Sequence, residues 1–589
     1  MTLSRRSYEG IGASPGVAIG EVVVFDRQNV TVRRRHVAAD AVEAEIERLE
    51  TAMAEARREV EVVLEGLSDA AGADHRLLLQ TQLLMLGDEM ISSAATDAIR
   101  GGRINAEWAL RQSVDAICAR LRSADDALFR ERADDVHNVG EHLLRALTGQ
   151  RARTLPALDH PTILVASDLT PAEAAHLSAS RVLALVTDSG SASSHTAILA
   201  RALQIPAVVG VADITREIGP GDTVIVDAMR GEVVVHPDPE EVEEARARGE
   251  RFEAFRERLR DVEARARETA DGVRIALLAN IDLEMDLPHV KHEGADGIGL
   301  YRTEFLYLDR SAPPSEDEQV LIYGRVARRM APRPVVFRTF DLGADKMPNA
   351  MRRGPNPALG LRALRVAFER PELLVTQLRA LLRAAASGQV RVMFPMVASV
   401  ADLRRAKVML ETARGDLEAQ GATYGPVMIG SMLEVPSAVL MADRLAPECD
   451  FFSVGTNDLT QYALAVDRGD PRVAHLASSL DPAVLRLLQR AHAVAEAHGK
   501  PISVCGDLAA DPVATAVLVG LGYRSLSMPT AAIPLVAEAL RRVPVPEAEE
   551  VAREALEQDG AADVERLVAA RFGDRLGELW REQGIELPR

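Results

Sequence analysis

The chain has 589 residues, which is enough for three or four domains at about 150 residues each. Its residues are 47% hydrophobic and 27% charged, with 40 Gly and 30 Pro, so wholesale disorder and a fibrous repeat are excluded. The net charge of −19 at pH 7 argues against nucleic acid as the main partner, because it would repel a phosphate backbone.

The N-terminal part begins with a β-like run at residues 17–25 and then becomes helical. Between Asp40 and Leu67, apolar residues recur every three or four positions, which is the period of an amphipathic helix. We therefore predict a helical module over residues 31–149. Further helical patterns within it lie at 77–86, 106–121 and 134–147.

Short β-rich runs return after Pro156. We expect the strand at 17–25 to join them, so that residues 1–30 and 150–237 form one discontinuous α/β domain that carries the helical module as an insertion. A strongly charged stretch then predicts a solvated linking helix over 238–270. The β-rich runs are 162–166, 182–187, 206–209, 223–227 and 232–235.

Residues 271–589 contain eight apolar runs with helical patterns between them, the rhythm of a (β/α)8 barrel of the TIM type. An open doubly wound sheet is the alternative. The runs are 274–280, 297–302, 334–341, 390–396, 427–434, 450–458, 501–507 and 523–528.

Basic side chains gather near the ends of these runs, where a barrel places its catalytic groups. Arg302 ends the second run and Arg338 lies in the third. Lys346, Arg362 and Arg468 add charge for binding a small dianion or trianion. Any one arginine alone is more typical of a surface ion pair, so the hypothesis depends on their convergence.

Acidic and thiol groups end three further runs. Glu434 and Asp458 come from adjacent strands and offer oxygen ligands suited to Mg²⁺. The combination predicts a cup for a phosphorylated carboxylate. Cys505 ends the seventh run; such a cysteine is most often a small buried hydrophobe, but its place beside anion-binding groups favours a role in proton transfer.

The stretch at residues 187–201 is rich in small hydrogen-bonding residues, follows a predicted strand and opens a helix with Ser193 or Ser194 as its N-cap. His195 is then expected in the first helical turn, where free N–H groups and the helix dipole favour an attached anion. Neutral imidazole attacks phosphorus, so His195 is a candidate phosphohistidine, while a capping or core role is the alternative. No nucleotide-binding motif with proper flanks is evident.

The three cysteines, Cys118, Cys449 and Cys505, are far apart and form no CxxC pair. This spacing argues against a disulfide framework and a structural zinc site. No segment has the apolar length of a membrane span or of a signal-peptide core. We expect a soluble protein of the cytoplasm.

Four segments together carry a resemblance to a known family: His195–Arg201, Gly299–Phe305, Phe451–Tyr462 and Val466–Arg468. They resemble enzyme I of the bacterial phosphoenolpyruvate:sugar phosphotransferase system, the phosphoenolpyruvate-protein phosphotransferases. The resemblance covers essentially the whole chain, including the helical insertion. The barrel segments alone also look like phosphoenolpyruvate synthase and pyruvate phosphate dikinase, which need an additional ATP-grasp domain.

This resemblance implies that His195 attacks phosphoenolpyruvate through Nε2, with Mg²⁺ as cofactor and pyruvate as product. The phosphoryl group then passes to a histidine of the small carrier HPr, which docks on the helical domain. The resemblance also implies a homodimer joined through the barrels and an α/β domain that swings about hinges near 25–40, 149–160 and the linking helix. The implied site residues are Arg302, Arg338, Asn457, Asp458, Arg468, Lys346 and Arg362 for the substrate, Glu434 and Asp458 for the metal, and Cys505 as proton donor.

The chain departs from the family pattern in three places. Ser191, Ala192 and Ser193 stand where a second Gly and an Arg are common before the histidine. Asp507 stands where Glu is frequent, and the segment that resembles the carrier-docking region, 83–90, has Gly87 at a commonly acidic position. A nucleotide-dependent dikinase-like enzyme and a non-catalytic regulator that senses phosphoenolpyruvate are the alternative functions.

Overall fold

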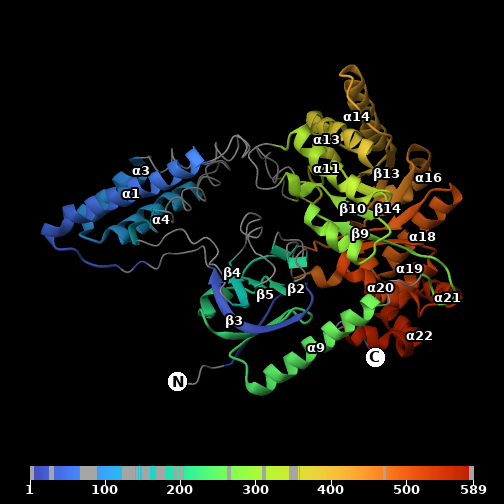
Figure 1. Cartoon of the computed structure of the whole chain (residues 1–589), viewed down its shortest axis with the longest axis horizontal. Coiled ribbons are helices and arrows are strands. Elements are labelled where there is room, and N and C mark those ends of the chain that lie inside the picture. Colours follow the sequence, from blue (N-terminus) through green and yellow to red (C-terminus); the bar gives the residue numbers. More distant parts are fainter. Residues whose placement is uncertain are drawn as a thin grey trace.

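A computed structural model shows a helical arm, a sheet domain and a barrel, with one long helix running from the sheet to the barrel (Figure 1). Among the residues described, no helix has both the length and the apolar character needed to cross a membrane. The structure describes residues 5–25, 32, 34–66, 89–122, 140, 143–144, 146–148, 160–167, 181–190, 196–197, 200–201, 205–261, 267–307, 313–343, 356, 358–468 and 472–582.

The sheet domain holds eight strands in the order β1-β8-β7-β3-β4-β5-β6-β2. The strand at 17–25 joins the later strands, as expected from the sequence, and at the centre of the sheet it pairs in parallel with the strand at 162–166. Helical and turn segments cover both faces, and β4 is buried along its whole length, which suits the uninterrupted apolar sequence of a covered parallel strand. The strands are β1 (Arg6–Glu9), β2 (Ile11–Ser14), β3 (Val17–Phe25), β4 (Thr162–Ala166), β5 (Val182–Thr187), β6 (Ala207–Val209), β7 (Thr223–Asp227) and β8 (Glu232–Val235), with the short helix α8 (Ile214–Glu217).

The helical arm is built on α1 (Val42–Gly66), α3 (Glu89–Gly102) and α4 (Ala106–Arg122). Their apolar faces share one buried cluster, which includes Leu49 and Leu110. This confirms the helical reading of 40–67 and 106–121. The predicted helix at 77–86 lies outside the described residues, as does nearly all of the segment 83–90.

The linking helix α9 spans Pro239–Asp261 and begins with a reciprocal cap, in which Asp238 and Glu241 each accept the other's backbone N–H. It is less solvated than predicted. Phe255 and Leu259 are buried with the barrel core, whereas Ala245 is buried against the sheet. A narrow apolar stripe at helical spacing therefore anchors an otherwise charged helix at both ends.

The C-terminal part is a closed barrel of eight parallel strands, so the open-sheet alternative is wrong. The first and last strands, β9 and β16, pair over five residues to close it. The strands are β9 (Ala276–Ile281), β10 (Ile298–Arg302), β11 (Val335–Arg338), β12 (Val390–Phe394), β13 (Met428–Leu433), β14 (Phe451–Val454), β15 (Ile502–Val504) and β16 (Ser525–Pro529).

Helices surround the barrel on its outer side (Figure 1). Among the described residues, their apolar faces and the outward faces of the strands form the largest buried cluster. The helices are α10 (Leu287–His292), α11 (Glu316–Met330), α12 (Leu364–Glu369), α13 (Pro371–Ala384), α14 (Val400–Ala419), α15 (Pro436–Leu440), α16 (Ala442–Leu445), α17 (Thr456–Leu464), α18 (Pro482–Ala497), α19 (Ala514–Gly520), α20 (Ile533–Leu540), α21 (Val545–Ala555) and α22 (Ala561–Glu582).

Three predicted strands end at least three residues earlier than the apolar pattern indicated, and one of them, the run at 334–341, ends at Arg338. The run at 450–458 becomes helical at Thr456, and the run at 501–507 leaves the sheet after Val504. A glycine follows closely in both cases, Gly455 and Gly506, where the chain turns out of the barrel. The first of these turns places Asp458 in the first turn of α17, where the helix dipole favours a carboxylate.

Candidate active site

The carboxyl ends of the parallel strands bring charged side chains to one mouth of the barrel. Arg302 and Arg338 are the last residues of β10 and β11, and Glu434 follows β13 directly. Asp458 and Cys505 follow β14 and β15. Residues taken from five strands therefore meet around one space.

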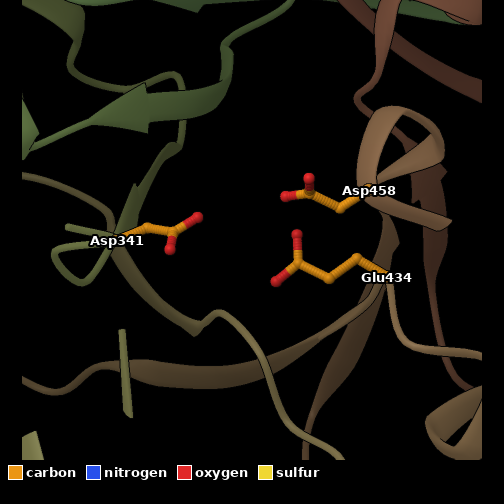
Figure 2. A group of neighbouring side chains, drawn as sticks. All are labelled: Asp341, Glu434 and Asp458. Atoms are coloured by element: carbon orange, nitrogen blue, oxygen red, sulfur yellow. The ribbon is translucent and has the colours of Figure 1, made fainter. Parts of the chain in front are cut away.

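Three carboxylates, from Asp341, Glu434 and Asp458, converge there (Figure 2). One oxygen of each lies within 4.8 Å of the others. All three side chains are buried, and the Asp341 side chain is only 2% exposed. Asp341 was not among the predicted site residues, although it ends the third apolar run, and that position is the signal that could have indicated it.

The surroundings shift the pKa values of these carboxyl groups in opposite directions. Burial, together with the charges of Asp458 and Asp341, raises the pKa of Glu434 to about 8. Burial also acts to raise the pKa of Asp341, but Arg362 and Arg338 outweigh it and the net shift is downward. Glu434 resists ionisation because it is buried beside two other carboxyl groups. A divalent cation would balance their charge, so the three groups together are a suitable set of ligands for one.

Arginines surround this cluster. Arg362 bonds both oxygens of Asp341, at 3.0 and 2.8 Å, and reaches Asp458 at 3.3 Å. Arg468 contacts the other oxygen of Asp458 at 3.2 Å. These contacts orient both guanidinium groups, of which that of Arg362 is largely buried whereas the Arg468 side chain is 44% exposed.

The two strand-end arginines are held by acids that the sequence reasoning did not single out. Arg338 donates to Glu304 at 2.8 Å, and Arg302 donates to Asp282 at 3.1 Å. Within the described residues, the buried Nε of Arg338 has no hydrogen-bond partner. An unsatisfied guanidinium N–H is costly in a buried site, so this donor fits an anionic ligand.

Asn457 and Asp507 hold each other by two hydrogen bonds. The amide nitrogen of Asn457 donates to Asp507 at 2.9 Å, and the backbone N–H of Asp507 donates to the amide oxygen at 2.8 Å. The shorter acid at position 507 therefore orients the Asn457 side chain through a closed pair of bonds.

Cys505 is 2% exposed and lies at the apolar interior of the barrel. Its Sγ donates to the carbonyl of Val454 at 3.4 Å. Burial raises the pKa of the thiol to about 11, so the group keeps its proton at neutral pH. A retained proton close to the positive charges of Arg338 and Arg302 is what a proton donor needs.

The structure thus brings together eight predicted site residues and leaves two undescribed. His195 and Lys346 lie outside the described residues, and so does the loop with Ser191 and Ala192. The residues that meet at the barrel mouth are Arg302, Arg338, Arg362, Glu434, Asn457, Asp458, Arg468 and Cys505.

Three family models match the chain. They are described as "PEP-utilising enzyme, N-terminal" over residues 9–132, "PEP-utilising enzyme, mobile domain" over 158–231 and "PEP-utilising enzyme, PEP-binding domain" over 256–545, where PEP is phosphoenolpyruvate. The sheet domain accordingly contains the segment matched by the mobile-domain model, and the barrel contains most of the segment matched by the PEP-binding model.

Curated relatives match over nearly the full length. A phosphoenolpyruvate-protein phosphotransferase of Geobacillus stearothermophilus is 37% identical, covering 97% of this chain and 99% of that protein. One from Haemophilus influenzae is 36% identical, covering 95% and 98%. A solution structure titled as Enzyme I is 31% identical over 42% of this chain and 99% of that one, with a TM-score of 0.31. On the two full-length matches, the chain belongs to the phosphoenolpyruvate-protein phosphotransferase family.

Proposed function

We propose that this protein is a phosphoenolpyruvate-protein phosphotransferase that phosphorylates its own His195 and then passes the group to a histidine of an HPr-like carrier, the first step of sugar uptake by the phosphotransferase system. The observation that carries the proposal is the barrel mouth, where four arginines surround three buried carboxylates. This pairing suits a trianion bound together with a divalent cation.

The proposed reaction moves one phosphoryl group and one proton. The bond from phosphorus to the enol oxygen breaks as a bond from phosphorus to Nε2 of His195 forms. The enolate then takes a proton at its methylene carbon from the Cys505 thiol, which gives pyruvate, and water restores the thiol proton. The raised pKa of Cys505 supports this role, because the thiol is protonated when the enolate appears.

Binding and alignment fall to the arginines and to Asn457. Arg302, Arg338 and Arg468 neutralise phosphate and carboxylate charge, and Arg362 and Lys346 add to the same field. Asn457, oriented by Asp507, holds the phosphoryl oxygens. The four arginines and Asn457 are already held by carboxylates of the barrel, so little reorganisation is needed when the substrate arrives.

Glu434 and Asp458 are the proposed ligands of Mg²⁺, with Asp341 close enough to join them. When bound, the ion supplies positive charge that stabilises phosphate and enolate oxygens. The close packing of three carboxylates and the raised pKa of Glu434 support a cation here.

The proposed domain division is 1–30 with 150–237 for the phosphohistidine domain, 31–149 for carrier binding, 238–270 for the linker and 271–589 for substrate binding and dimerisation. The pairing of β3 with β4 supports the discontinuous first domain. Exposed apolar side chains at Leu440 and Met441 on the barrel support contact with a second copy. Three buried cysteines that form no disulfide suit the cytoplasm.

The test is to mix the protein with labelled phosphoenolpyruvate and Mg²⁺ in the absence of nucleotide. We expect acid-labile label on the peptide that contains His195, transfer of that label to HPr, and no label in His195→Ala. His160→Ala, an exposed histidine of the same domain, is the matched control and should label normally. Label that moves only with nucleotide would indicate a dikinase-like enzyme. No label with bound phosphoenolpyruvate would indicate a regulator.

A further inference from the structure

Arg201 lies on the sheet domain, six positions after His195 in the sequence. Residues 196–197 and 200–201 are helical, so Arg201 belongs to the helical segment that follows the histidine. Its Nη1 donates to the carbonyl of Ala13, at 3.0 Å, in the neighbouring strand β2. This bond fixes the side chain within its own domain, but a neutral carbonyl does not balance the guanidinium charge.

Three acids, Asp282, Asp286 and Asp507, form an acidic rim on the barrel. Asp282 pairs with Arg302, while Asp286 is buried and accepts backbone N–H groups from Asp282 and Leu283 at 3.2 and 3.0 Å. Asp507 is held by Asn457. Among the described residues, the three rim acids therefore form a single ion pair, the one between Asp282 and Arg302.

Arg201 and Asp507 of this rim line the same cavity between the two domains. Arg201, Ser14 and Pro15 from the sheet domain line a cavity of about 400 Å³ whose barrel side includes Asp507 and Asp511. The negative charges that act most strongly on Arg201 all come from the barrel, namely Asp282, Asp507 and Asp286. Burial lowers the pKa of Arg201 and Arg302 acts in the same direction, so the net shift is downward even though the three acids act to raise it. The rim therefore offsets only part of the cost of removing this guanidinium from water.

We propose that Arg201 and the acidic rim form the docking contact that seats the sheet domain on the barrel for phosphoryl transfer from phosphoenolpyruvate. The inference rests on the proposed function, since it assumes that His195 takes the phosphoryl group. Arg201 is a positioning residue: it sets how the sheet domain lies relative to the barrel mouth. Asp507 links docking of the sheet domain to substrate binding, because it lines the same cavity as Arg201 and also orients Asn457 at the substrate site.

The contact matters for only one of the two half-reactions. Transfer from phosphoenolpyruvate requires the sheet domain to meet the barrel, whereas exchange with the carrier does not use the rim. A residue that merely stabilises the sheet domain through Ala13 affects both half-reactions alike. A docking residue affects the first and spares the second.

The experiment uses the full chain with Arg201→Gln and measures two rates. The first is labelling from phosphoenolpyruvate with Mg²⁺, which we expect to fall about 10- to 100-fold, the effect of losing a charge-assisted contact. The second is labelling of the same variant from phospho-HPr, which we expect to stay within about twofold. Arg201→Lys keeps the charge and should recover most of the first rate. Arg216→Gln, an exposed arginine of the same domain paired with Asp213, should change neither rate.

Asp286→Asn tests the contact from the barrel side and should slow only labelling from phosphoenolpyruvate. Equal loss of both rates in Arg201→Gln, or no loss in either, would overturn the docking role. If the unaltered chain takes no label from phosphoenolpyruvate, the proposed function itself fails and this inference fails with it. If the unaltered chain, Arg201→Gln and Asp286→Asn all take label normally, the docking role fails but the proposed function stands.

Discussion

Asp341→Asn removes one negative charge from the barrel mouth while keeping the shape of the side chain. Asp341 accepts two bonds from Arg362, and one of its carboxylate oxygens lies 3.3 Å from Arg338. The substitution leaves both guanidinium groups buried with less negative charge beside them. We therefore expect lower stability of the barrel and a weaker hold on the orientation of Arg362.

The magnitude follows from the partners that remain. Breaking a buried ion pair by removing one partner costs about 3 to 5 kcal/mol. Here Arg362 still reaches Asp458 at 3.3 Å and Arg338 still bonds Glu304 at 2.8 Å, so part of the charge stays compensated. We expect a loss of about 2 to 3 kcal/mol in the free energy of unfolding of the metal-free barrel.

The assay exploits the two tryptophans of the chain. Trp580 is buried in α22 beside the barrel, and Trp108 lies in the helical arm, so urea unfolding followed by fluorescence in a Trp108→Phe background reports on the barrel. Asp443→Asn, an exposed acid on the same domain, is the control and should change stability by less than about 0.5 kcal/mol. A loss below about 1 kcal/mol for Asp341→Asn would refute the electrostatic account of the cluster.

Two further predictions concern proton transfer and pH. Cys505→Ser should slow formation of pyruvate about 10²- to 10⁴-fold in rapid-quench single turnovers while the dissociation constant of phosphoenolpyruvate stays the same; an unchanged rate would remove the thiol from the reaction. Because the pKa of Glu434 is raised from its ordinary 4.5 to about 8, the folded metal-free protein holds a proton that the unfolded chain loses. Its stability therefore falls as pH rises from about 4.5 to 8, and Mg²⁺ affinity increases over that window. Calorimetry at pH 7 in two buffers of different ionisation enthalpy should detect about one proton released per Mg²⁺ bound. Glu434→Gln should release no proton. Zero release in the unaltered protein would contradict the raised pKa of Glu434.

The barrel was predictable because its strands are buried on both sides and read as short apolar runs. The ends of those runs indicated most of the site, since parallel strands place their carboxyl ends on one rim. Arg302, Arg338 and Glu434 each lie at or directly after the end of a strand. The sequence therefore contained the positions of these groups along the chain.

What the sequence could not provide is which charges pair. Asp341 and Glu304 read as ordinary acids within their motifs, and only the folded chain places them against Arg338. The edge strands β1 and β2 were missed for another reason. Each has four residues with no apolar run, and pairing with β8 and β6 rather than local pattern makes them strands.

The central pairing of β3 with β4 has a consequence for how the protein is made. The two strands are adjacent in the sheet but separated by about 140 residues of chain. At about 5 to 20 residues per second, the ribosome needs roughly 7 to 30 seconds to deliver β4 after β3 has emerged. Until then, the apolar side chains of β3 have no neighbouring strand to cover them, while the helices of the arm can already fold through contacts close in sequence. The sheet domain is thus completed late, only after the whole helical arm and then β4 and β7 have been made.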